Sequence, residues 1–259
     1  MKLFKIIRIL ILLLLLASVA FYSKTQKLKS QSWASPLNVV IYPLNADNSP
    51  EVADYISGLK EDDFIEIDDF FQRQSKNYSI VTPQPTLTTL GQTLTDHFPP
   101  TPTPNSSPLE IIWWGLKFRY WAFRYTPDSE SNHHRVRVFL HYHKADDNSV
   151  LQHSLGMDKG LLAIVHAFGD KRQQAQNNII IAHELLHTVG ATDKYGANNQ
   201  PAFPEGYANP DKTPLHPQKK AEIMSARIPL TVTKSVMAET LKQCVINQQT
   251  AKEINWSAL

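Results

Sequence analysis

The sequence predicts a single α/β domain, α+β in class, and three observations support this. Of its 259 residues, 42% are hydrophobic and 19% charged, which is typical of a globular chain. Short runs rich in β-branched residues occur among segments whose apolar residues recur at helical spacing. Seven prolines lie between 83 and 108, and the parts of the chain on either side are each too small to fold comfortably alone. We therefore expect that stretch to be a long loop inside one domain.

Residues 1–22 are predicted to be either a signal peptide or an N-terminal membrane anchor. Lys2, Lys5 and Arg8 precede fourteen uncharged residues at 9–22. Small residues after the leucine run suit a signal peptidase, whereas the length of the apolar segment approaches a bilayer span. In both cases the cations stay cytoplasmic, so the remainder is expected to be extracytoplasmic. It would then be secreted, or anchored and facing the periplasm or exterior.

Residues 23–35 are polar and are interpreted as a tether, and the domain is expected to occupy 36–259. A β-branched run bounded by prolines predicts the first strand at 36–45. Helical spacing of apolar residues predicts helices at 50–60 and 63–76.

An aromatic segment follows at 108–127. Trp114, Phe118, Trp121 and Tyr125 are three or four residues apart, which favours a helix, although alternation in the same stretch would also fit a strand. Such a stripe is usually part of a core. It would also suit the surface of a membrane if the chain stays anchored.

Two more strands are predicted, at 134–143 and 160–169. In the first, four apolar residues alternate with polar ones, so His141 and His143 share a face with two arginines. We expect this polar face to be exposed to solvent. Cys244, the single cysteine, is expected to be a small buried residue, since it can form no intramolecular disulfide and has no activating neighbour.

The charge of the chain argues against nucleic acid as a partner. The net charge is +2, but three of the 26 basic residues lie within the first eight positions. The remaining 23 are balanced by 24 acidic residues. Phosphate binding requires a basic face, and no basic cluster stands out.

The segment "HELLHTVGATD" carries the most specific signal. His183 and His187 are four residues apart, so a helix would place both imidazoles on one side, where they can share a metal ion. Glu184 is displaced around the helix, so its carboxylate would reach a metal-bound water. Gly190 is placed to end the helix, and Asp193 follows where the chain can turn back to the metal. Two nitrogens, one oxygen and an open position are typical of catalytic zinc.

This segment resembles the HExxHxxGxxH/D motif of the metzincin clan of zinc metallopeptidases, in the aspartate-bearing branch that includes the snapalysins. Met224 lies 37 residues after His187, where it is similar to the methionine of the clan's Met-turn. The motif similarity covers roughly residues 160–245. It implies a mixed twisted sheet and a C-terminal helix, expected at 233–244.

The resemblance also implies a function: hydrolysis of peptide or protein substrates with Zn²⁺, by a water whose proton Glu184 accepts. The strand at 161–168 is expected to pair with extended substrate. Where some metzincins have a metal-binding tyrosine, this chain has Ala226. Oxyanion stabilisation is left to one of three residues: Tyr195, Tyr207 or Arg227. Oligomeric state stays open.

One rival ligand and two rival functions also fit parts of the sequence. Glu205 lies at a distance at which other zinc peptidases supply a glutamate, but its proline-flanked segment cannot be helical, which favours Asp193. The alternative function is an exported zinc-binding scaffold or binding domain without turnover. A more remote one is a membrane-tethered structural protein without a metal. The presence of Glu184 favours the enzyme.

Overall fold

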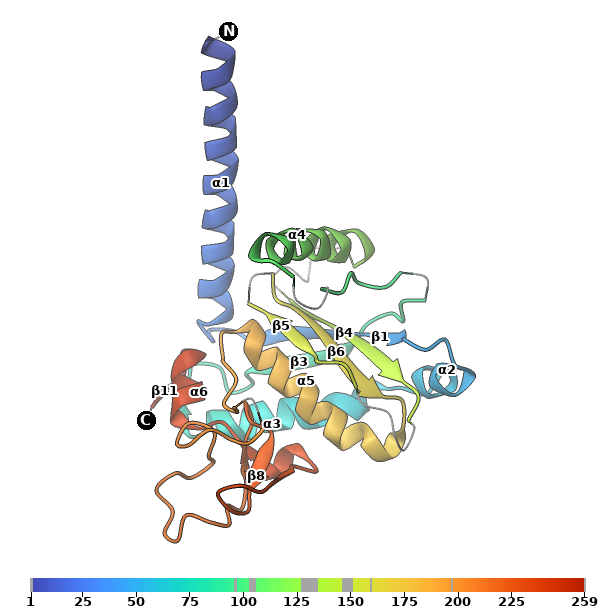
Figure 1. The fold of residues 1–259 in the computed structure, drawn as a ribbon, viewed down its shortest axis with the longest axis vertical. Helices are drawn as coiled ribbons and strands as arrows, with labels where there is room; N and C mark the ends of the chain where they lie inside the picture. Colours follow the sequence, from blue (N-terminus) through green and yellow to red (C-terminus); the bar gives the residue numbers. More distant parts are fainter. Residues whose placement is uncertain are drawn as a thin grey trace.

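The computed structural model describes residues 2–95, 97–102, 106–126, 135–145, 151–158, 160–196 and 198–258. Its centre is a mixed five-stranded sheet with helices on both faces, which confirms the predicted α/β class (Figure 1). In spatial order the strands are β3 (Thr86–Leu90), β1 (Leu37–Asn45), β4 (Val136–His143), β6 (Leu162–Phe168) and β5 (Leu155–Met157). All neighbours pair in parallel except β5, which runs antiparallel to β6.

Alternation along the strands builds a core on each face of the sheet. In β1, Val39 and Ile41 join a core with helices α3 (Ile65–Ser75) and α5 (Gln174–Thr188). Val40 and Tyr42 join a second core with helix α4 (Pro108–Tyr125). Because a strand buried on both faces needs apolar residues at successive positions, β1 reads as a continuous apolar run. The strand predicted at 36–45 is confirmed.

The predicted helices at 50–60 and 63–76 are also confirmed. They form α2 (Pro50–Ser57) and α3, and a short 3-10 turn, η1 (Glu61–Phe64), precedes α3. The aromatic segment is helical, which excludes its strand alternative. Ser107 caps α4 in a reciprocal pair with Glu110, and Pro108 occupies the first turn, where no amide donor is needed.

The C-terminal part consists of short elements beneath α5. The helix expected at 233–244 is wrong, because β9 (Ser235–Met237) pairs there with β8 (Arg227–Pro229). The C-terminal helix lies later, at α6 (Gln248–Glu253). The remaining short elements are β2 (Tyr78–Ser79), η2 (Lys171–Gln173), β7 (Ala221–Glu222), η3 (Leu241–Gln243), β10 (Cys244–Val245) and β11 (Ser257–Ala258). Cys244 is buried, as expected.

The polar face of β4 is covered, contrary to the expectation of solvent exposure. His141 is 5% exposed and packs against Phe98 of the proline-rich loop. Burial, with the neighbouring His166 and His143, lowers the pKa of His141 to about 3. Sequence alternation assigns a face correctly, but whether a second layer covers that face depends on distant segments.

The N-terminal helix α1 (Lys2–Ser30) projects away from the domain (Figure 1). It continues through much of the segment that was expected to be a tether. Just beyond it, the Trp33 side chain is buried, and its indole N–H donates to the Ile254 carbonyl at 2.7 Å. No helix in the described part of the chain is both long and apolar enough to cross a membrane.

Candidate metal centre

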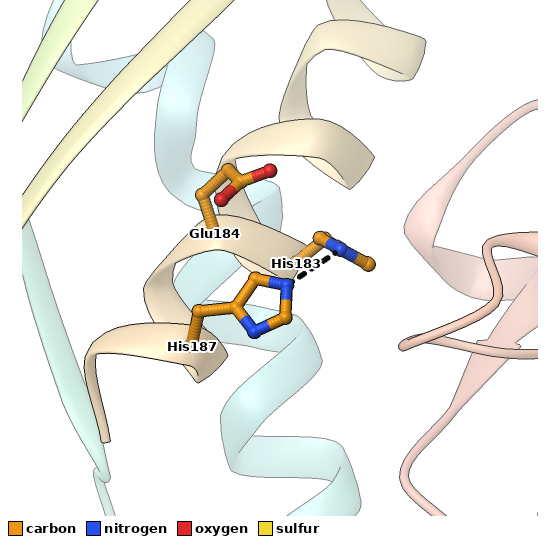
Figure 2. A group of neighbouring side chains, drawn as sticks. All are labelled: His183, Glu184 and His187. Atoms are coloured by element: carbon orange, nitrogen blue, oxygen red, sulfur yellow. Dashed lines mark hydrogen bonds between the residues drawn. The ribbon is translucent and has the colours of Figure 1, made fainter. Parts of the chain in front are cut away.

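Helix α5 follows strand β6 after a short turn and carries the histidine pair. Its inner residues, among them Ile181, Leu185 and Leu186, are buried in the core that it shares with the sheet. The helix is therefore held along its length. His183 and His187 project from one side of it, as Figure 2 shows, and both are largely shielded from solvent.

Three donor atoms converge beside this helix. His183 Nε2 and His187 Nε2 are 3.1 Å apart. Asp193 Oδ1 lies 3.2 Å from the first nitrogen and 3.1 Å from the second. Asp193 reaches them because α5 ends at Thr188 and Gly190 adopts φ +104°, a left-handed conformation that reverses the chain.

The other imidazole nitrogens are already engaged with backbone carbonyls. His183 Nδ1 is 3.1 Å from the Ile223 carbonyl oxygen, and His187 Nδ1 is 2.8 Å from that of Ala191. A carbonyl only accepts, so these contacts assign the ring protons to Nδ1. Each Nε2 of a neutral ring then offers a lone pair to the space that the two histidines share with Asp193.

This geometry suits a metal ion. Tetrahedral ligands at about 2.0–2.1 Å from a zinc ion are roughly 3.3 Å apart, close to the spacing of these three atoms. The ligand atoms of His183, Glu184 and His187 also all lie within 4.8 Å of one another. The donor set fits a metal held by two imidazoles and Asp193, with Glu184 beside it.

Glu184 is buried next to the histidine pair. Its side chain leaves α5 beside the imidazoles and not between them (Figure 2). Its Oε2 has no hydrogen-bond partner within the described chain. Burial raises the pKa of Glu184, although the two nearby histidines oppose this. Such a carboxylate is a better proton acceptor than an exposed one.

The pKa of Asp193 is shifted in the opposite direction to that of Glu184. Burial alone would raise the pKa of its carboxyl, but hydrogen bonds from His183 and His187, which form when the imidazoles are protonated in the metal-free protein, outweigh burial and lower it. Its side chain is 45% exposed, so the site opens to solvent on this side. The chain thus supplies an anionic ligand at a solvent-accessible edge.

A tight turn containing Met224 lies under the histidines. Met224 is fully buried, and its carbonyl accepts from the Lys194 amide at 3.1 Å, next to Asp193. The same turn supplies the Ile223 carbonyl that orients His183. Met224 therefore stands where the predicted turn would support the ligands.

The remaining sequence candidates are placed differently. The Tyr195 ring lies 6.4 Å from the His183 ring, and burial, with Asp193 nearby, raises the pKa of Tyr195 to about 12. Tyr207 instead pairs with a histidine of the proline-containing loop, and Arg227 binds Ser235. Glu205 is exposed and is absent from the metal-binding group. Of the three candidates for oxyanion stabilisation, only Tyr195 lies beside the histidine pair.

Edge strand β5 borders the centre and was not identified from the sequence. A Cβ on Gly156 would lie 2.5 Å from the Glu184 carbonyl oxygen and 2.5 Å from His187 Cβ. The strand can therefore approach α5 only because this residue is glycine. The strand expected at 161–168 is present as β6, but its expected pairing with substrate is wrong, because β6 is paired on both sides.

A cleft of about 450 Å³ opens next to the histidine pair. It is lined by Lys27, Arg119, Gly156, Met157, Asp158, His187, Gly190, Ala191 and Thr192. A larger cavity, about 870 Å³, lies near α6 and contains none of the metal-site residues. Of these two cavities, the cleft is the one that His187 lines, so it is the candidate substrate-binding region.

Glu222, in β7, is a second buried carboxyl that sequence analysis missed, although it stands two residues before Met224. It accepts from the Met224 amide at 2.6 Å and from the Thr250 hydroxyl at 2.7 Å. Burial raises its pKa from 4.5 to about 7, against these hydrogen bonds. Between about pH 4.5 and pH 7, the folded protein therefore keeps a proton on Glu222 that the unfolded chain has released.

Glu222→Gln is expected to make stability less dependent on pH. With a folded-state pKa above the unfolded value, wild type loses stability as pH rises from about 4.5 to 7, by up to roughly 3 kcal/mol. Glutamine does not titrate, so this loss should disappear. Urea unfolding of both proteins at pH 5 and pH 8, in excess chelator, measures the difference. An equal pH dependence in the two proteins would contradict this assignment.

Comparison with solved structures found distant similarities in fold. No family model and no curated protein sequence matches the chain. Among solved structures, OgpA from Akkermansia muciniphila is similar in two crystal forms, with 13% identity and a TM-score of 0.38. The match covers 87% of this chain and 62% of OgpA, so this chain spans less than two thirds of that protein. A similarity of this extent defines neither a family nor an activity.

Proposed function

We propose that this protein is a zinc-dependent metalloendopeptidase that acts outside the cytoplasm. The observation that carries the proposal is the convergence of His183 Nε2, His187 Nε2 and Asp193 Oδ1 at 3.1–3.2 Å. With both Nδ1 atoms on carbonyls, three electron-rich atoms face one another, an arrangement that a cation stabilises. Two imidazoles and one carboxylate can hold several transition metals, and the proposal of zinc rests on Glu184, which is placed to accept a proton from a metal-bound water in hydrolysis.

A bound zinc ion would lower the pKa of a water molecule and polarise a peptide carbonyl. Glu184 then accepts a proton from the attacking water. As the C–N bond breaks, Glu184 delivers that proton to the leaving amine, so the carboxylate is regenerated. Its burial and raised pKa support this role. The Tyr195 hydroxyl stays protonated at neutral pH and is the best placed donor for the developing oxyanion.

The substrate would bind as an extended strand along β5. This strand is at the edge of the sheet, and its other side is paired with β6. An edge strand offers unpaired backbone groups to a peptide. Because Gly156 lies against Glu184 and His187, a peptide added to β5 would pass close to the metal ligands.

Metal content of the full chain tests the proposal first. The protein is purified in detergent without chelators or a histidine tag, beside His187→Ala, and metals are counted by mass spectrometry. We expect one zinc per chain in wild type and almost none in His187→Ala, because two ligands rarely retain zinc. His153→Ala, which removes an exposed histidine outside the cluster, should keep its zinc. A folded wild type without zinc would refute the proposal.

A further inference from the structure

Helix α4 is apolar on two opposite sides. Gly115, Phe118 and Ala122 are buried on the side that faces the sheet. Phe118 packs on Phe139 of β4, with ring centroids 5.6 Å apart. One side of the helix is thus fully accounted for by the second core.

The other side of α4 exposes a stripe of large apolar side chains. Their relative exposures range from 49% to 78%, and they recur every three or four residues: Leu109, Ile112, Trp113, Leu116, Tyr120 and Phe123. No residue in the described ranges covers them. A contiguous apolar stripe of this kind usually marks an interaction surface, whereas single exposed apolar residues are common.

Cations lie along the stripe. Lys117 Nζ is 5.6 Å from the centre of the Trp113 ring, and the Arg124 guanidinium is 5.6 Å from that of Tyr125. The helix has a single acidic residue, Glu110, which is engaged in the N-terminal cap. Aromatic and aliphatic residues bordered by lysine and arginine are the composition of helices that lie in the interface of an anionic membrane.

The position of α4 in the fold agrees with such a surface. Figure 1 shows α4 lying across the direction of α1, on the side of the domain from which α1 projects. The projecting part of α1 also exposes apolar side chains, from Phe4 through Leu14 and again at Phe21. If α1 entered a flat apolar layer end-on, the surface of that layer would therefore lie parallel to α4. No spanning helix is needed for α4 to bind there.

We propose that the outer stripe of α4 binds the surface of a phospholipid bilayer that carries anionic headgroups. The apolar residues enter the region between headgroups and acyl chains, while Lys117 and Arg124 contact lipid phosphates. Lys27 of α1 and Arg119 of α4 both line the cleft beside His187. Binding through α4 therefore holds that cleft next to the membrane surface. This inference stands independently of the proposed catalytic activity.

Site-specific fluorescence on the full chain tests this surface. Cys244 is buried and its pKa is raised to about 12 by burial, so in the folded protein a thiol-reactive dye should label only an introduced cysteine. Tyr120→Cys places the environment-sensitive dye NBD on the stripe. Val232→Cys places it at a comparably exposed apolar position, three residues after the end of β8. Strand β8 lies at the end of the domain opposite α1 (Figure 1). Unmutated protein checks that Cys244 stays unlabelled.

Both proteins are reconstituted in phosphatidylcholine vesicles containing phosphatidylglycerol, with or without acyl-chain spin labels. At position 120 we expect a blue shift of at least 10 nm and at least twofold quenching by the spin-labelled lipid. At position 232 we expect neither. Adding Leu116→Glu and Phe123→Glu should abolish the signal at 120.

Two results would overturn the proposal. One is a label at 120 that is as exposed as the label at 232. The other is a blue shift without lipid quenching that grows with protein concentration, since a second copy of the chain would then cover the stripe. A circular dichroism spectrum and a urea midpoint equal to those of the parent would show that the charged variant keeps its fold, so that loss of the signal reflects loss of membrane binding.

Discussion

Glu184→Gln is expected to bind one zinc per chain and to lose about 10²–10⁴-fold in peptide cleavage. Glutamine keeps the size of the side chain but cannot accept a proton from water. Because the three metal donors come from other residues, zinc binding should persist. Cleavage of casein and of a mixed fluorogenic peptide library, together with zinc content, measures both effects.

Glu205→Gln is the matched control for that variant. Glu205 is exposed and lies outside the histidine group. Replacing it with glutamine should therefore leave both the zinc content and the rate of cleavage unchanged. Normal cleavage by Glu184→Gln would refute the assigned mechanism. Loss of zinc from Glu184→Gln would instead give Glu184 a role in holding the metal. A wild type that binds zinc and cleaves nothing would favour a binding domain without turnover.

Gly156→Ala is expected to destabilise the protein by about 1–3 kcal/mol and to weaken zinc binding at least tenfold. The added methyl group would stand 2.5 Å from the Glu184 carbonyl oxygen and from His187 Cβ. Neither atom is the end of a flexible side chain, so β5 or α5 must shift. A shift of α5 moves both imidazoles.

Urea unfolding and a zinc titration against a competing chelator measure the two effects of Gly156→Ala. Gly58→Ala serves as the control, because its added Cβ would meet only backbone oxygens, at 3.6 Å and 3.8 Å, and its φ of −90° suits any residue. Its stability should stay within about 0.5 kcal/mol of wild type. Unchanged zinc affinity in Gly156→Ala would show that β5 does not position the ligands.

The spacing of apolar and polar residues predicted the helices and strands whose structure depends on residues close by in the sequence. Helix α5 and the side that His183 and His187 share follow from a spacing of four residues, which a helix converts directly into proximity. Strand β1 and helices α2 and α3 were likewise readable, because their apolar residues face a core at a regular period. The candidate metal centre is predictable for the same reason, since its proposed ligands span only 183–193.

The errors arise where distant segments decide the structure. Residues 233–244 have a helical pattern, but Ser235–Met237 gains backbone partners from Arg227–Pro229 and becomes a strand. His141 is buried because Phe98, 43 positions earlier in the sequence, packs on it. Three-residue β5 has too few positions to show any period, so Gly156 could not be linked to the metal centre from sequence alone.

The junction after α1 has a mechanical consequence. The Gln31 amide donates to the Val189 carbonyl, just past the end of α5, and the Trp33 indole donates to Ile254. Lys194, next to Asp193, is in turn paired with Glu253 at 2.7 Å. Tension applied along α1 would therefore not be absorbed by a slack linker. It would be transmitted through these contacts to the loop that carries Asp193, so under the proposed function strain on the N-terminal helix would change the affinity for zinc.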